Sequence, residues 1–136
     1  MNKKPLKERY VSFEIAKILR KKGFDGLCSA YYDCFTTDNL HEGNEPTNFN
    51  EIDPKVRDIV SAPTLQMACE WLREKHKLYI EPFVIKNYDK NELEYTYTIQ
   101  DLDFPGSDDG IECCKSWNSS ELAVEAAVKY CIEKLI

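Results

Sequence analysis

The sequence predicts an α+β domain: an antiparallel sheet of three to four strands with three helices. Two observations carry this prediction. Residues 61–77, SAPTLQMACEWLREKHK, have the apolar spacing of an amphipathic helix. Residues 78–89 and 91–102 then form two aromatic, β-branched runs on either side of a short turn, which is typical of a hairpin. The expected order of elements is α-β-α-β-β-(β)-α.

The first helix is predicted over residues 13–22. Ser12 is a favourable N-cap, and Gly23 supplies a residue that ends a helix in the left-handed conformation. One face of this helix is apolar and consists of Val11, Ile15, Ile18 and Leu19.

The segment after Gly23 loses the helical period. Residues 24–35, FDGLCSAYYDCF, favour a strand. Residues 36–50 are dense in Thr, Asn, Gly and Pro, so we expect a surface loop there. Residues 51–60 fit both a helical turn and an extended segment, and the pattern does not choose between them.

The second helix is expected to begin near Pro63 and to end near Lys77. Of the two strands that follow it, the first contains Pro82, which lacks a backbone N–H and therefore favours an edge position. A loop over 103–110, a short strand in IECCKSW and a last helix over about 120–135, capped by Asn118 or Ser119, complete the prediction.

The composition indicates one globular domain over residues 1–136. Hydrophobic residues make up 43% and charged residues 31%. No apolar run approaches the roughly 18 residues that would span a bilayer, and residues 1–22 lack the apolar core of a signal peptide. We therefore expect a cytoplasmic protein without a membrane partner, whose thiols stay reduced, with Cys28, Cys69 and Cys131 buried as small apolar side chains.

The charges are segregated along the chain. Residues 1–22 hold eight basic and two acidic side chains, whereas the other 114 residues hold 22 acidic and ten basic ones. Such a basic end suggests a contact with nucleic acid, for which the candidates lie in an N-terminal arm over residues 1–11: Lys3, Lys4, Lys7 and Arg9. The simpler interpretation, which we prefer, is that this segment docks on the acidic body of its own chain or of a partner copy.

Three segments resemble a known group of proteins: VSFEIAKILRKKGF, SAPTLQMACEWLREKH and SELAVEAAVKYCIEKLI. Together they resemble small uncharacterised proteins of Bacteroides-type gut bacteria and of their prophages and other mobile elements. The likeness covers about a third of the chain, and TLQMA followed by WLRE is its most specific part. It implies a cytosolic, phage-related protein and carries no functional residue onto this chain.

The acidic segment DLDFPGSDDGIE partly matches a calcium-binding loop of the EF-hand type. Four acidic residues fall at ligand positions: Asp101, Asp103, Asp109 and Glu112. However, Pro105 replaces a ligand, and the preceding segment has the pattern of a strand where an EF-hand has a helix. A polar connection is the simpler interpretation, and we expect no metal or other cofactor.

The adjacent thiols Cys113 and Cys114 are the other candidates for chemistry, because a thiolate is a nucleophile and a metal ligand. No C-x-x-C pair occurs, and His41 and His76 lack ligand-like spacing. We therefore assign no catalytic residue.

The aromatic side chains of the hairpin are the remaining candidates for a functional surface: Tyr79, Phe83, Tyr95 and Tyr97. They suggest a stacking platform for single-stranded nucleic acid, although the acidic neighbours favour cross-strand packing. The preferred hypothesis is a non-enzymatic protein-interaction module of mobile-element origin, with a protein partner or self-association through the hairpin. The alternative is a nucleic-acid-binding or nucleic-acid-mimic regulator, and a small thiol enzyme or calcium-binding protein is the residual interpretation.

Overall fold

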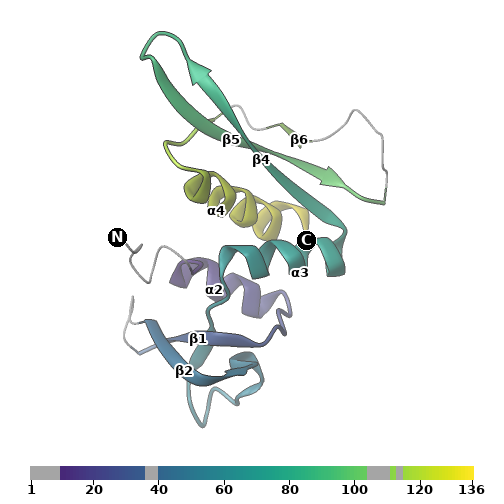
Figure 1. Ribbon diagram of the computed structural model, residues 1–136. Helices are drawn as coiled ribbons and strands as arrows, with labels where there is room; N and C mark the ends of the chain where they lie inside the picture. Colours follow the sequence, from purple (N-terminus) through teal and green to yellow (C-terminus); the bar gives the residue numbers. More distant parts are fainter. Residues whose placement is uncertain (1–9, 36–39, 104–110, 113–114) are drawn as a thin grey trace. The chain divides into compact units, whose positions relative to one another are not determined.

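The computed structural model describes residues 10–35, 40–103, 111–112 and 115–136, the pair 111–112 by its backbone only. The chain divides into two compact units, Met1–Ala68 and Cys69–Ile136. The described elements confirm an α+β fold with antiparallel strands and three α-helices (Figure 1). The strands lie in two sheets of three strands, instead of one sheet. The expectation of a single domain stays a prediction.

The first unit begins with helix α2, Phe13–Lys21, as predicted. The Ser12 side chain accepts a hydrogen bond from the backbone N–H of Ile15, which satisfies one of the N–H groups left open at a helix start. Gly23 follows the helix with a φ of +88°, the left-handed conformation that glycine adopts without strain. The sequence therefore determines both ends of this helix.

The first sheet has the order β2-β1-β3, with β1 over Cys28–Asp33, β2 over Leu40–Thr47 and β3 over Ile59–Ser61. The prediction of a loop over residues 36–50 is wrong where the chain forms β2, and where it forms a short 3₁₀ helix, η1, over Phe49–Glu51. Hydrogen bonding to β1 overrides the weak strand propensity of the β2 sequence LHEGNEPT. Residues 36–39 lie outside the described residues.

One face of the first sheet is buried in the unit's core. Tyr32 is buried on this face, stacks on Phe13 with ring centroids 5.4 Å apart and donates a 2.6 Å hydrogen bond to the carbonyl oxygen of Val11. Tyr10 and Val11, the last residues of the predicted basic arm, are themselves buried. The predicted arm is therefore wrong at these two positions, where the chain pairs with residues 63–64.

Helix α3, Leu65–His76, crosses the boundary between the units, so that its residues from Cys69 onward belong to the second. The predicted hairpin follows as β4, Leu78–Asn87, and β5, Glu92–Asp101, which pair along their whole length. A short strand β6, Ile111–Glu112, extends the sheet in the order β4-β5-β6. Strand β4, which contains Pro82, lies at an edge, as its missing N–H predicts.

Helix α4, Ser120–Tyr130, packs against β4 and β5 and continues as a π-helical turn, Cys131–Leu135 (Figure 1). Ser119 is the N-cap, and its side chain accepts a hydrogen bond from the N–H of Leu122. The buried side chains of α4 include Ala123 and Ala127, whose small size permits a close approach of helix to sheet. Among the described residues, no helix has the length and apolar character needed to cross a bilayer.

Candidate functional site

The register of the hairpin separates the four aromatic side chains for which the sequence suggested a stacking platform. Tyr95 lies opposite Val84 and Tyr97 opposite Pro82, whereas Phe83 lies opposite Thr96. Directly opposed residues of an antiparallel pair share a face, and neighbours along a strand alternate. Tyr79 and Phe83 therefore lie on one face of the hairpin, and Tyr95 and Tyr97 on the other.

This separation of the aromatic side chains could have been predicted from the sequence. The turn spans residues 88–91, between the paired Asn87 and Glu92. A turn with an even number of residues pairs odd-numbered positions of one strand with even-numbered positions of the other. Because all four aromatic residues have odd numbers, they divide between the two faces by strand.

The aromatic residues also differ in how far they are covered. Tyr97 is buried and stacks on Trp117 with ring centroids 5.7 Å apart, so it belongs to the core of the second unit. Tyr95 is half-buried. Tyr79 and Phe83 are exposed on the other face, Phe83 to 42%. A continuous platform for stacked bases is therefore not formed by these side chains.

The face that carries Tyr95 has a second apolar feature, which the sequence did not single out. Val84 is 52% exposed and Leu93 is 58% exposed. Since Val84 pairs with Tyr95 and Leu93 with Lys86, these apolar residues are neighbours on one face. We call the set Pro82, Val84, Leu93 and Tyr95 the hairpin patch.

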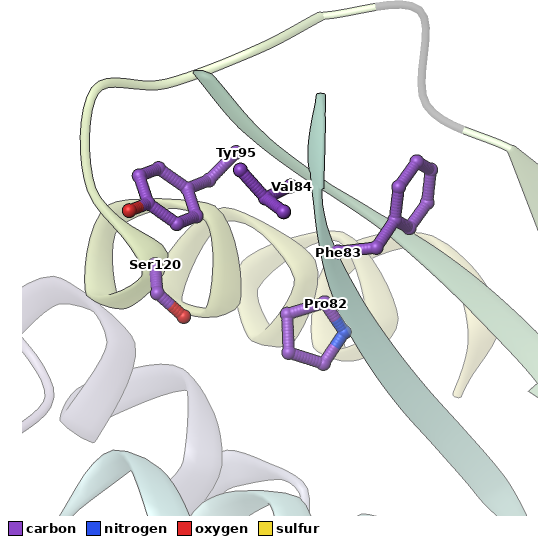
Figure 2. Close-up of a pocket in the computed structure, with 5 residues that line it drawn as sticks. All are labelled: Pro82, Phe83, Val84, Tyr95 and Ser120. Atoms are coloured by element: carbon purple, nitrogen blue, oxygen red, sulfur yellow. The ribbon is translucent and has the colours of Figure 1, made fainter. Parts of the chain in front are cut away.

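A hollow of about 410 Å³ opens at the hairpin patch. Its lining residues come from β4, β5 and the first residue of α4: Pro82, Phe83, Val84, Tyr95 and Ser120. Figure 2 shows the Tyr95 ring over the start of α4, with Val84 beside it, and Phe83 pointing away on the far side of β4. The lining is apolar except for the hydroxyl groups of Tyr95 and Ser120, so this hollow suits an apolar side chain.

Among the described strands, β4 pairs on one side only, and its outer edge carries features that protect sheet edges from pairing. Pro82 cannot donate a backbone hydrogen bond, and the charged Glu81 and Lys86 are exposed along the same strand. Proline and lysine on edge strands are devices that suppress strand addition. The geometry thus favours contacts through the face of the hairpin over pairing along its edge.

Glu94 fixes one end of the segment that precedes α4. Ser116 donates a 2.6 Å hydrogen bond to Oε2 of this carboxylate, and the Asn87 amide donates one of 2.9 Å to Oε1. These hydrogen bonds lower the pKa of Glu94 below its ordinary value, and the hydrogen bond from Ser116 has the larger effect. The carboxylate therefore stays charged at neutral pH and contributes to the acidic character of the second unit, which has 14 acidic and eight basic side chains.

The described cysteines lack the features of reactive thiols. Burial raises the pKa of Cys28 and of Cys69 to about 11 and that of Cys131 to about 12. Burial, with Asp58 adding to it, also raises the pKa of Cys34. Cys28 and Cys131 are buried as predicted, while Cys69 is half-buried. A nucleophilic cysteine needs a lowered pKa, so none of these four suits that role; Cys113 and Cys114 lie outside the described residues.

The candidate calcium loop is only partly described. Asp101 ends strand β5, and its carboxylate accepts a 3.0 Å hydrogen bond from the backbone N–H of Asp103. Asp109 and the side chain of Glu112 lie outside the described residues. Within the described part of the chain, no three His, Cys, Asp or Glu side chains are grouped as metal ligands.

The four basic residues predicted to contact nucleic acid, Lys3, Lys4, Lys7 and Arg9, also lie outside the described residues. His41 belongs to β2, in the first unit, and His76 ends α3, in the second.

Comparisons with models of known protein families, with curated proteins and with solved structures find no match to this chain.

Proposed function

We propose that this chain is a non-enzymatic protein-interaction module and that the hairpin patch is its contact surface. One observation carries the proposal: Val84 and Leu93 expose more than half of their surface beside an apolar hollow. Apolar side chains gathered at a hollow are typical of surfaces that bind protein partners, because a buried anchor residue supplies most of the affinity. A cytosolic location agrees with the free thiols of the four described cysteines, which an oxidising compartment would pair or modify.

The partner that fits the hairpin patch best is a protein with an exposed apolar anchor residue flanked by Lys or Arg. Around the hairpin patch, residues 79–95 contain four acidic side chains against two basic ones: Glu81, Asp89, Glu92 and Glu94 against Lys86 and Lys90. A basic rim complements this surface and speeds association. A second copy would place like charges against each other, which disfavours self-association through the same patch.

The mode of contact is packing on the face of the hairpin. Strand addition needs an edge with free N–H groups, and β4 offers Pro82 there. Face packing instead uses Val84, Leu93 and the hollow, none of which depends on backbone pairing.

The test compares two identical substitutions at exposed valines. Val84→Asp adds a charge within the hairpin patch, and Val56→Asp adds the same charge at an 81% exposed valine of the first unit. Quantitative pull-down from cells that naturally contain the protein should identify a partner whose recovery falls about tenfold with Val84→Asp and is unchanged with Val56→Asp. Thermal melting of both variants establishes that each is folded.

Two results would overturn the proposal. The first is a set of recovered proteins that does not respond to Val84→Asp. The second is a concentration-dependent dimer, measured by sedimentation at micromolar concentrations, that Val84→Asp dissociates, because the occupant would then be a second copy.

A further inference from the structure

A second surface lies in the first unit, on the sheet face opposite the buried Tyr32. Tyr31 pairs with His41 across strands β1 and β2, and their rings stack with centroids 5.2 Å apart and planes inclined by 19°. The Arg57 guanidinium lies 5.0 Å from the centre of the Tyr31 ring. The same guanidinium donates a 2.8 Å hydrogen bond to the Tyr31 hydroxyl. We call His41, Tyr31 and Arg57 the cationic stack.

The scaffold beneath the stack is well packed. Phe49 of η1 is buried and lies against Tyr31 with ring centroids 4.7 Å apart. The backbone N–H of Phe49 donates to the Ser61 hydroxyl at 3.0 Å, and the N–H of Ser61 donates to the Asn50 side chain at 2.9 Å. Phe49 of η1, itself hydrogen-bonded to β3, therefore supports the Tyr31 ring, while His41 and Tyr31 stay half-buried and Arg57 stays exposed.

Among the described arginines of the first unit, Arg57 differs from Arg20 in its partner. Arg20 forms an ion pair with Asp58 at 3.3 Å. In the described part of the first unit, Arg57 has an aromatic partner and no carboxylate, even though Asp53 and Asp58 are close in sequence. A guanidinium has five N–H donors in a planar fork, so the single bond to Tyr31 leaves most of them for a ligand.

We propose that the cationic stack binds a nucleoside monophosphate. The guanidinium fork matches phosphate oxygens, which accept paired hydrogen bonds from it. A nucleobase stacks on an aromatic or imidazole ring regardless of its identity.

A small anion fits this unit better than a long polyanion does. The first unit holds ten acidic and ten basic side chains, so its net charge is zero. Long nucleic acids bind mainly through an array of basic residues that neutralise successive phosphates. The cationic stack offers one guanidinium and one imidazole, which is enough for a single phosphate group.

The experiment titrates the full chain with adenosine monophosphate and follows binding by NMR. We expect the ring signals of His41 and Tyr31 to shift and the Arg57→Ala variant to weaken binding about tenfold, the usual effect of losing a charged hydrogen bond. Lys55→Ala is the matched control, because it removes the same charge from an exposed side chain in the same turn. Lys55→Ala should bind within about twofold of the parent chain.

Separate titrations with adenosine and with inorganic phosphate distinguish the two halves of the ligand, and each should bind more weakly than the nucleotide. Arg57→Lys keeps the charge without the fork, and it replaces Arg57→Ala if that variant does not fold. The proposal is overturned if millimolar adenosine monophosphate does not shift the ring NMR signals of His41 and Tyr31. Equal weakening by Arg57→Ala and Lys55→Ala overturns it too, because only general charge attraction would then be at work.

Discussion

The Ser116 hydroxyl donates a 2.6 Å hydrogen bond to the carboxylate of Glu94 and so joins the segment before α4 to strand β5. In the same segment the backbone groups of Trp117 and Tyr95 exchange two hydrogen bonds, of 2.7 and 2.8 Å. The start of α4 is thereby fixed relative to the hairpin, and with it the position of Ser120 in the hollow.

Ser116→Ala should raise the pKa of Glu94 toward its ordinary value, since the hydrogen bond from Ser116 is the largest cause of its lowered pKa. A carboxyl group with a lowered folded-state pKa stabilises the fold above its unfolded-state pKa, which is about 4.3 for glutamate, and loses that effect as the pH falls through the folded-state value. The parent chain should therefore lose more stability than Ser116→Ala on acidification below about pH 4. NMR titration of the glutamate side chains measures the pKa directly, with the exposed Glu92 as the internal control. An unchanged pKa of Glu94 in the variant would contradict the assignment.

Leu19→Ala and Leu27→Ala form a matched pair that tests the packing of the first unit. Leu19 is fully buried on α2, whereas Leu27 is 62% exposed just before β1. Removing a buried leucine side chain costs about 2–5 kcal/mol of unfolding free energy, while an exposed one costs less than about 1 kcal/mol. Denaturant unfolding of the two variants measures the difference. Equal losses would mean that α2 does not pack as described.

The helices and the hairpin were predictable because their signals are local. Ser12 and Gly23 mark the ends of α2, and the two strands of the hairpin are separated by a four-residue turn. Strand β2 was missed because its stability comes from pairing with β1. That pairing leaves no signal within residues 40–47, whose composition is typical of a loop. The two separate sheets were missed for the same reason, since strand partners outside a hairpin leave no local signal.

The candidate surfaces were predictable only in part. The aromatic residues of the hairpin were identified from the sequence, but their burial was not, and Tyr97 is buried. The exposed apolar residues beside the hollow, Val84 and Leu93, were not singled out. The cationic stack left no signal, because His41 and Arg57 lie 16 positions apart and meet only through Tyr31. Such a cluster requires the register between β1 and β2.

Gly23→Ala should destabilise the first unit through the backbone alone. Gly23 has a φ of +88°, and a Cβ added there meets no atom within 4 Å. The expected cost is about 1 kcal/mol of unfolding free energy, because an L-residue in the left-handed region is strained. Gly23→Asn should cost less, since asparagine tolerates this conformation better. Denaturant unfolding measures both variants, and a neutral Gly23→Ala would show that the helix end relaxes.

The stability of the protein should decline in alkaline solution as its buried thiols ionise. The pKa values of Cys28 and Cys69 are raised to about 11 and that of Cys131 to about 12, mainly by burial. A group whose folded-state pKa is raised stabilises the fold fully below its unfolded-state pKa, about 8.5 for cysteine, and loses that effect as the pH rises through the folded-state value. The decline from buried thiols should therefore span about pH 8.5 to 12.

Cys131→Ala tests this effect, because Cys131 is fully buried and has the most raised pKa of the described thiols. The variant should be about 1 kcal/mol less stable at neutral pH, where it lacks the buried sulfur atom, yet its unfolding free energy should fall less steeply above about pH 9. Cys34→Ala is the comparison: the pKa of Cys34 is raised too, but its side chain is only half-buried, so its removal should change the slope less. Denaturant unfolding at a series of pH values measures the slopes. If Cys131→Ala follows the same slope as the parent chain, the raised pKa of Cys131 plays no part in the alkaline decline.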